Sequence, residues 1–295
     1  MSGDAIGKAT FGTNQVAQAI TALFVPGNRP ERFEKAAAAG ADVVIIDLED
    51  AVPIPDKSRA LDAVVVALTA GALTPARAMV RINAIGTRSF ESEVATLVAL
   101  SAAPGNGLIG VMVPKAEHAG ELAELARRLP TGLPIVPLIE SGLGLRNCFE
   151  LASVAGVSRL AFGAIDFALD IDAGDGDRYL DYARSHLVVT SRAASIAAPL
   201  DSPSPEIRDA SLILESAVLA RNFGFGGKLC IHPAQIGSVT AAFTPSEESI
   251  RWARAVVDAG IEGAANLDGR MIDLPVIERA NRVLKRAGSL PKRAR

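Results

Sequence analysis

The stretch from Val43 to Asp50 reads VVIIDLED, an apolar run that ends in acidic residues. A continuous run rich in Val and Ile is typical of a strand buried on both faces of a parallel sheet. Seven similar runs follow the same pattern, and the eight start 21 to 36 residues apart, which leaves room each time for a helix and two loops. The eight runs are Ala22–Val25, Val43–Leu48, Met79–Ile82, Ile109–Val113, Ile135–Ile139, Arg159–Phe162, Ala193–Ala197 and Lys228–Ile231.

The segments between these runs have helical character, and several are closed by glycine or proline. The helices expected from this pattern are Arg32–Ala39, Asp56–Thr69, Ser89–Ser101, Glu117–Arg128, Asn147–Ala155 and Pro205–Phe223. Eight strand–helix units in about 210 residues predict an α/β fold of the (β/α)8 TIM-barrel type. Periodicity alone leaves a doubly wound open sheet as the competing architecture. The Pro-rich stretch 199–205 is expected to be a loop at the top of the barrel.

We therefore expect three parts: an N-terminal lead-in at 1–21, the barrel at 22–244, and a C-terminal helical extension at 245–295. The extension has two expected helices, Glu247–Ala259 and Pro275–Ala287. It looks too short for an independent domain, so we interpret it as a lid or oligomerisation arm.

Composition excludes several classes of protein. Of 295 residues, 49% are hydrophobic and 4% aromatic, and the net charge is −3, so no basic field or stacking surface exists for nucleic acid. Two cysteines cannot form a disulfide framework. No uninterrupted apolar run reaches 18 residues, and the N-terminus lacks the pattern of a signal peptide, so a cytoplasmic protein without membrane contact is expected.

Charged residues follow most of the predicted strands, at the ends that meet at the mouth of a barrel. Folding alone does not require such a ring of charge, whereas binding of a substrate or metal does. The candidates are Arg29, Asp47, Glu49, Asp50, Arg81, Lys115, Glu140 and Asp166.

Glu140 and Asp166 form the sharpest pair, because they end consecutive strands and have no His or Cys nearby. Two carboxylates are hard oxygen ligands that suit Mg²⁺, although an acid–base dyad is the rival interpretation. Arg81 could bind a substrate carboxylate as a fork, or could simply be an ion-pair partner of Glu49 and Asp50.

At these positions the sequence resembles the citrate lyase β-subunit-like family of the HpcH/HpaI aldolase superfamily, which includes malyl-CoA and citramalyl-CoA lyases. The matching stretches, in order, are FVPGNRPERF at 24–33, DLEDAV at 47–52, RIN at 81–83, VPK at 113–115, IES at 139–141, FGAID at 162–166, GK at 227–228, IHPAQ at 231–235 and DGRMID at 268–273.

The resemblance implies a (β/α)8 barrel assembled as a homotrimer or hexamer, with Mg²⁺ held by Glu140 and Asp166. It implies that Arg81 binds a substrate carboxylate or carbonyl and that Arg29 lines the same site. Glu49 and Asp50 would support this chemistry, and Lys115 would contact substrate. The acid matching Asp273 would reach the active site of a neighbouring subunit and transfer a proton.

The activity that follows is Mg²⁺-dependent carbon–carbon cleavage, or formation, of a 3-hydroxyacyl-CoA that carries a carboxylate. The products would be a 2-keto acid and an acyl-CoA, and thioester hydrolysis would be an additional activity. Three alternatives stay open: the β subunit of a multi-subunit citrate lyase acting on an acyl-carrier thioester, a CoA-independent 2-keto acid aldolase, and an inactive ligand-binding barrel.

Overall fold

The computed structural model describes the whole chain apart from residues 1–14, 70–75, 175–177, 262–265, 268–269 and 290–295. Most of the expected N-terminal lead-in, residues 1–14, therefore lies outside the described residues. The chain forms two compact units, Met1–Val239 and Thr240–Arg295.

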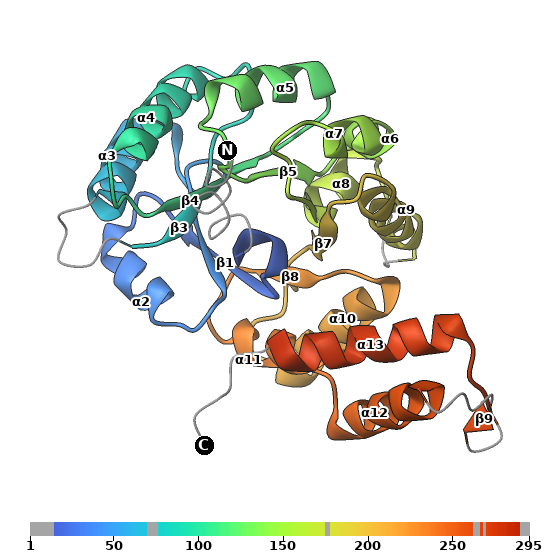
Figure 1. Cartoon of the computed structure of the whole chain (residues 1–295). Coiled ribbons are helices and arrows are strands. Elements are labelled where there is room, and N and C mark those ends of the chain that lie inside the picture. The colour runs from blue at the N-terminus through green and yellow to red at the C-terminus, as the bar shows by residue number, and fades with distance from the viewer. Residues whose placement is uncertain (1–14, 70–75, 175–177, 262–265, 268–269, 290–295) are drawn as a thin grey trace, which may run out of the picture. The chain divides into compact units, whose positions relative to one another are not determined.

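The first unit is a closed barrel of eight parallel strands in sequence order, with β1 paired to both β2 and β8 (Figure 1). This arrangement confirms the TIM-barrel prediction and excludes the open sheet. The strands are β1 Thr21–Pro26, β2 Val43–Asp47, β3 Ala78–Arg81, β4 Leu108–Val113, β5 Ile135–Ile139, β6 Arg159–Phe162, β7 Ala197–Asp201 and β8 Gly227–Cys230.

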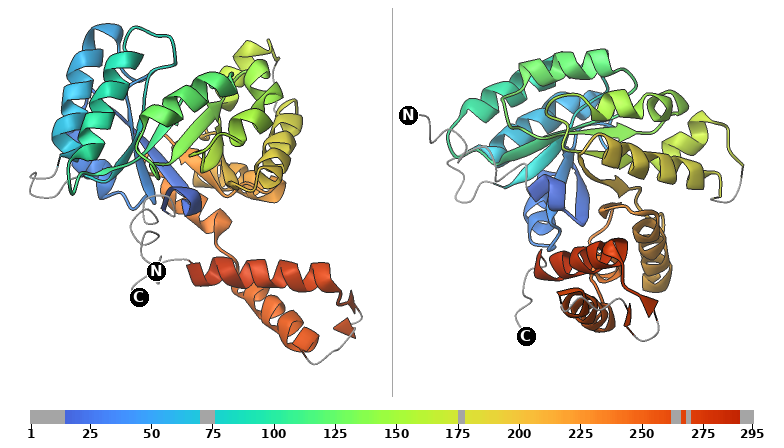
Figure 2. Two further views of the ribbon diagram at one scale, coloured as in Figure 1. Left: turned by 45° about the horizontal axis from the view of Figure 1, so that its top comes forward. Right: turned by 45° about the vertical axis from the view of Figure 1, so that its right-hand side comes forward.

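Helices follow the strands and pack around the outside of the barrel (Figure 2). Their ends match local signals: Asp209 accepts hydrogen bonds from the first turn of α10, and Gly224 closes that helix at a φ of 105°. The helices are η1 Pro30–Arg32, α2 Phe33–Ala37, η2 Ile54–Asp56, α3 Lys57–Leu68, α4 Phe90–Ala102, α5 Ala119–Arg128, α6 Gly142–Arg146, α7 Cys148–Ala152, α8 Ala164–Asp170, α9 Leu180–Ala193, α10 Ala210–Phe223 and α11 Gln235–Phe243.

The barrel interior is a packed apolar core. Ile45, Met79 and Leu138 belong to one buried cluster, which draws members from all eight strands. At its amino end the buried Arg159 side chain donates hydrogen bonds to the carbonyl oxygens of Val16, Ala19 and Ala198, at 2.6 to 3.0 Å. The fully buried guanidinium therefore has its donors satisfied by backbone rather than by a carboxylate.

Strand seven was predicted in the wrong place. Ala193 ends helix α9, which the sequence pattern did not reveal, and the strand runs from Ala197 to Asp201. The stretch expected to be a loop therefore begins inside a strand. Pro199 is tolerated there because the pairing between β6 and β7 shifts register between Arg159 and Ala161, as at a bulge.

The second unit contains α12 Glu247–Ile261 and α13 Leu274–Ser289, joined through the short antiparallel strands β9 Asn266–Leu267 and β10 Arg270–Met271. The two helices were expected from the sequence. They share an apolar cluster of their own, built on Ala253, Val256 and Ala280. The unit begins at Thr240, whereas the sequence pattern suggested residue 245.

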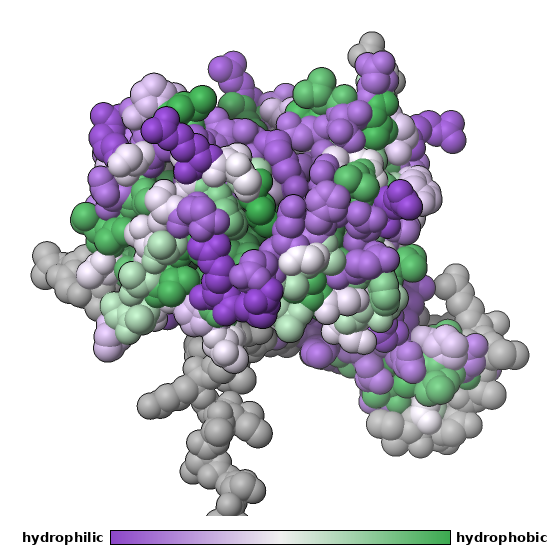
Figure 3. All heavy atoms as spheres, turned by 90° about the horizontal axis from the view of Figure 1, so that it is seen from above, coloured by the Kyte–Doolittle hydropathy of each residue, from purple (hydrophilic) through white to green (hydrophobic). Residues whose placement is uncertain are grey.

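The face in Figure 3 mixes hydrophilic and hydrophobic residues. In the part of the chain that the structure describes, no helix is long and apolar enough to span a membrane.

Candidate active site

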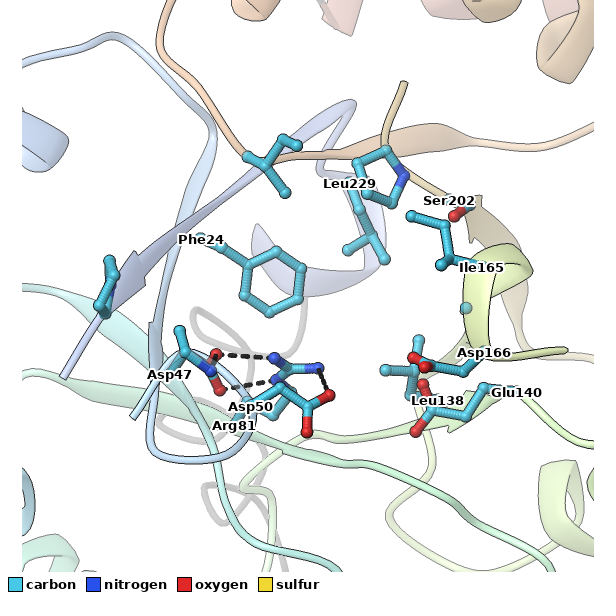
Figure 4. Close-up of a pocket in the computed structure, with 15 residues that line it drawn as sticks. Phe24, Asp47, Asp50, Arg81, Leu138, Glu140, Ile165, Asp166, Ser202 and Leu229 are labelled. Carbon is cyan, nitrogen blue, oxygen red and sulfur yellow. Dashed lines mark hydrogen bonds and ion pairs between the residues drawn. The ribbon is translucent and has the colours of Figure 1, made fainter. Parts of the chain in front are cut away.

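A cavity of about 430 Å³ opens at the carboxyl ends of the barrel strands. It collects five of the charged residues that the sequence placed at strand ends, together with an apolar wall (Figure 4). The lining consists of Phe24, Pro26, Asp47, Asp50, Ala51, Arg81, Leu138, Glu140, Gly163, Ile165, Asp166, Ser202, Pro203, Leu229 and Ile231.

Arg81 is held by Asp47 in a two-pronged ion pair. Its Nε and Nη2 atoms donate to the two carboxylate oxygens of Asp47 at 2.7 and 2.6 Å. The same carboxylate accepts the backbone N–H groups of Glu49 and Ala51, so Asp47 shapes the turn after β2 and orients Arg81 at once. The Cζ atom of Arg81 lies over the Phe24 ring, 4.8 Å from the ring centroid, in a cation–π contact.

The Arg81 guanidinium also lies 2.9 Å from Glu49 and 4.0 Å from Asp50. Burial by itself would lower the pKa of Arg81, but the hydrogen bond and charge of Asp47 and the charges of Glu49 and Asp50 outweigh it and raise that pKa. The side chain is 11% exposed. A guanidinium carries five N–H donors. Two of them donate to Asp47, whereas the ion-paired Glu49 Oε2 accepts no hydrogen bond, so N–H groups on the two Nη atoms remain for a ligand.

Lys115 connects two parts of the site. Its backbone N–H donates to Glu140 Oε1 at 2.7 Å, and its Nζ donates to Glu49 Oε1 at 2.5 Å. The backbone of Lys115 has a left-handed φ of 49°, which is uncommon for residues other than glycine. Burial raises the pKa of Glu49 despite Arg81 and Lys115. The Lys115 side chain lines a neighbouring cavity with Glu49 and Asp50.

Glu140 and Asp166 lie beside each other in the pocket (Figure 4). Glu140 is 3% exposed, and its Oε2 atom has no hydrogen-bond partner. Burial, followed by the charges of Glu49 and Asp166, raises the pKa of Glu140 to about 8. Gly163 makes room for this carboxylate, because a Cβ there would lie 2.6 Å from Glu140 Oε2.

These carboxylates fit a Mg²⁺ ion, which prefers oxygen ligands and neutralises clustered negative charge. A buried carboxylate oxygen without a partner is the kind of donor that such an ion would satisfy. Within the described ranges, no group of three or more His, Cys, Asp or Glu side chains could hold a metal. The pair would thus leave coordination positions for water and substrate.

Three further residues, Lys57, Asn83 and Glu93, hold the backbone of the turn that follows β2. The sequence analysis assigned them no role. Lys57 Nζ donates to the carbonyl oxygens of Leu48 and Glu49, both at 2.7 Å. Asn83 donates to the Leu48 carbonyl at 2.9 Å and is itself held by the buried Glu93 carboxylate. One signal was available: Glu93 falls on the apolar stripe of its helix, where an unpaired acid would be costly.

Four sequence candidates lie outside this pocket lining: Glu49 and Lys115, which line the neighbouring cavity, and Arg29 and Asp273. Arg29 is exposed and pairs with Glu31 at 2.6 Å. Asp273 lies in the second unit, where its side chain accepts the N–H of Val276 in the first turn of α13. Their predicted roles in substrate binding and proton transfer remain predictions.

The family model that matches this chain is described as HpcH/HpaI aldolase/citrate lyase and covers residues 21–233. The chain is 38% identical over 275 residues to a citrate lyase subunit beta-like protein of Mycobacterium tuberculosis, covering 90% of this chain and 94% of that protein. It is 30% identical over 297 residues to the mitochondrial citramalyl-CoA lyase of Homo sapiens, covering 92% and 86%.

Solved structures of the CitE protein of M. tuberculosis are also similar. One, in complex with magnesium, acetoacetate and coenzyme A, has a TM-score of 0.79 at 34% identity and covers 92% of this chain and 99% of that one. A structure of the citrate lyase beta subunit from M. tuberculosis, in complex with oxaloacetate and magnesium, has a TM-score of 0.67 at 33% identity and covers 79% of this chain and 100% of that one.

Proposed function

Because this chain belongs to the HpcH/HpaI aldolase/citrate lyase family, we propose that it is a Mg²⁺-dependent carbon–carbon lyase. Its substrate is a 3-hydroxyacyl-CoA that carries a carboxylate on the hydroxyl-bearing carbon, and its products are a 2-keto acid and an acyl-CoA. The observation that carries this proposal is the meeting of Arg81, Glu140 and Asp166 in one pocket, since these groups suit an anionic, oxygen-rich substrate.

Arg81 binds the substrate carboxylate through the N–H groups of its Nη atoms that do not donate to Asp47. A guanidinium whose orientation is already fixed loses little side-chain entropy when it binds, which favours a defined position for the carboxylate. Asp47 contributes by fixing that orientation through two short hydrogen bonds.

Glu140 and Asp166 hold the Mg²⁺ ion, with Gly163 keeping the space beside Glu140 open. When bound, the ion lowers the pKa of the substrate hydroxyl and stabilises the negative charge that develops on its oxygen. Lys115 keeps Glu140 in place through its backbone N–H, and its side chain tethers Glu49.

The reaction breaks the bond between the hydroxyl-bearing carbon and the carbon next to the thioester. The hydroxyl proton leaves, its oxygen becomes the ketone of the 2-keto acid, and the bonding electrons pass to a thioester enolate. We assign Asp50, which is exposed at the pocket and close to Arg81 and Lys115, as the base that accepts the hydroxyl proton. We assign protonation of the enolate carbon to Asp273, contributed by a neighbouring subunit of a homotrimer or hexamer.

A panel assay tests the proposal. Malyl-, citramalyl-, β-methylmalyl- and citryl-CoA are each incubated with Mg²⁺ or with EDTA, and the release of keto acid is measured alongside free malate or citramalate from thioester hydrolysis. We expect Mg²⁺-dependent keto acid release from at least one ester. Turnover only with an acyl-carrier thioester would instead favour a citrate lyase subunit, and Mg²⁺ binding without any turnover would favour a ligand-binding barrel.

The role of Asp273 is tested separately. Asp273→Ala should abolish carbon–carbon cleavage while Mg²⁺ affinity, measured by calorimetry, stays unchanged. Loss of the cap on α13 destabilises that helix by about 1 kcal/mol, so Asp273→Asn, which keeps a capping oxygen, serves as the matched variant. Cleavage by Asp273→Ala at the wild-type rate would remove this residue from the mechanism.

A further inference from the structure

The pocket has a charged side and an apolar side. Figure 4 shows Arg81 between Asp47 and Asp50, with Glu140 and Asp166 across from them, whereas Phe24 and Leu229 lie on another side. The uncharged lining is mostly hydrocarbon and includes Phe24, Leu138, Ile165, Pro203, Leu229 and Ile231. A substrate bound to the charged groups therefore presents part of its surface to this apolar wall.

Counting charges shows how many carboxylates the pocket can accept. Among the described residues that line it, four are acids and Arg81 alone is a base. A divalent cation would add two positive charges and still leave a net negative site. Lys115 does not supply another free cation, because it lines the neighbouring cavity and its Nζ is paired with Glu49 at 2.5 Å and lies 3.7 Å from Asp50.

One substrate carboxylate can thus be paired with Arg81, but a second would meet carboxylates, hydrocarbon or at most the single hydroxyl of Ser202, and no second cation. An unpaired carboxylate against an apolar wall loses its hydration without compensation. Size does not make the same distinction, since a cavity of about 430 Å³ has room for a methyl or a carboxymethyl substituent alike. Charge is therefore the property that discriminates.

Resting on the function proposed above, we infer that the hydroxyl-bearing carbon of the substrate carries hydrogen or a small alkyl group and no second carboxylate. The 2-keto acid that leaves is then a monocarboxylate of the glyoxylate or pyruvate class. Phe24, Leu229 and Ile231 are the specificity-determining residues, because they supply the wall that faces the substituent.

The M. tuberculosis structure with oxaloacetate shows that a related barrel can bind a dicarboxylate. The inference concerns the preference of this chain in turnover, where the substituent must stay in place while the carbon–carbon bond breaks. It therefore needs a direct comparison of substrates that differ only in that substituent.

The test compares kcat/KM for citramalyl-CoA, whose substituent is methyl, with kcat/KM for citryl-CoA, whose substituent is carboxymethyl. We expect a preference of about 10- to 100-fold for citramalyl-CoA, because the wall is partly exposed at Ile165 and Ile231 and an unpaired carboxylate against it loses only part of its hydration. Equal values, or a preference for citryl-CoA, would overturn the inference.

A variant with an added cation makes the comparison specific. Ile231 is 46% exposed at the pocket, so Ile231→Arg places a guanidinium at the wall with little risk to the fold and should narrow the preference at least about 10-fold. Leu169→Arg is the control, because Leu169 is 81% exposed on α8 and does not line the pocket. An unchanged preference in Ile231→Arg, or the same narrowing in the control, would count against the apolar wall.

The experiment also separates this inference from the proposed function. If the wild-type protein cleaves none of the esters, the proposed function fails. Calorimetry with pyruvate and with oxaloacetate in the presence of Mg²⁺ then decides the inference alone: tighter binding of pyruvate supports it, and tighter binding of oxaloacetate overturns it.

Discussion

Gly163→Ala adds a single methyl group at the point where Glu140 has least room. The backbone of Gly163 has a φ of −101°, so alanine meets no left-handed strain there. The new Cβ would instead lie 2.7 Å from Glu140 Cβ and 2.6 Å from its Oε2. Since ordinary contact begins at 3.4 Å, Glu140 must move by about 0.7 Å, the difference between 3.4 and 2.7 Å.

That displacement is large for a metal ligand. Mg²⁺ binds oxygen at about 2.0–2.1 Å in near-ideal octahedral geometry, and ligand distances in working sites vary by only about 0.2 Å. We therefore expect Gly163→Ala to weaken Mg²⁺ binding by about 10- to 100-fold, the range typical of changes beside metal ligands. Activity should fall in parallel and recover in part at high Mg²⁺ concentration.

Isothermal titration calorimetry with Mg²⁺, together with keto acid release over a range of Mg²⁺ concentrations, measures the effect. Gly120→Ala is the matched control, because Gly120 lies in α5 and an added Cβ there meets nothing within 4 Å. If Gly163→Ala bound Mg²⁺ as tightly as the wild type and kept the wild-type rate, the prediction that Glu140 binds Mg²⁺ in its present position would be wrong.

Three further predictions concern the same pocket. Arg81→Lys keeps the charge but loses the two-pronged contact with Asp47, so kcat/KM should fall at least about 100-fold with Mg²⁺ affinity unchanged; wild-type kinetics would refute the fork. The pKa of Glu140 is raised to about 8, so without metal the folded protein retains a proton that the unfolded chain loses, and stability should fall as pH rises from about 4.5 to 8. Urea unfolding in EDTA should show this fall in the wild type and a smaller one in Glu140→Gln. Lys57→Met should lower kcat about 10-fold at unchanged Mg²⁺ affinity, with recovery in Lys57→Arg; a lower melting temperature at full kcat would mean that Lys57 only stabilises the fold.

The barrel could be predicted because its buried strands are continuous apolar runs at regular spacing. The seventh strand could not, since Pro199 and two alanines lack the Val and Ile that mark the other strands. The stretch predicted in its place, Ala193–Ala197, runs from the last residue of α9 to the first residue of β7. Only the pairing of β7 with β6 and β8 shows that the strand occupies 197–201 rather than 193–197.

The position of a residue at the end of a predicted strand showed that it would lie at the mouth of the barrel. It did not show which of these residues would form hydrogen bonds or ion pairs with one another. Lys115 and Glu49 are 66 positions apart, and Lys115 also has a left-handed backbone that no local sequence pattern requires. Lys57 acts through backbone carbonyl oxygens, which every residue possesses and which leave no trace in the sequence.

The two attachments of Lys115 affect how this position responds to sequence change. Its side chain donates a hydrogen bond to Glu49, whereas its hydrogen bond to Glu140 comes from the backbone N–H and remains when the side chain is replaced. Substituting every other residue at this position would therefore report on the contact with Glu49 and would leave the contact with Glu140 untested. Tolerance there would depend as much on ease of adopting a positive φ as on charge, so glycine and asparagine could outrank arginine.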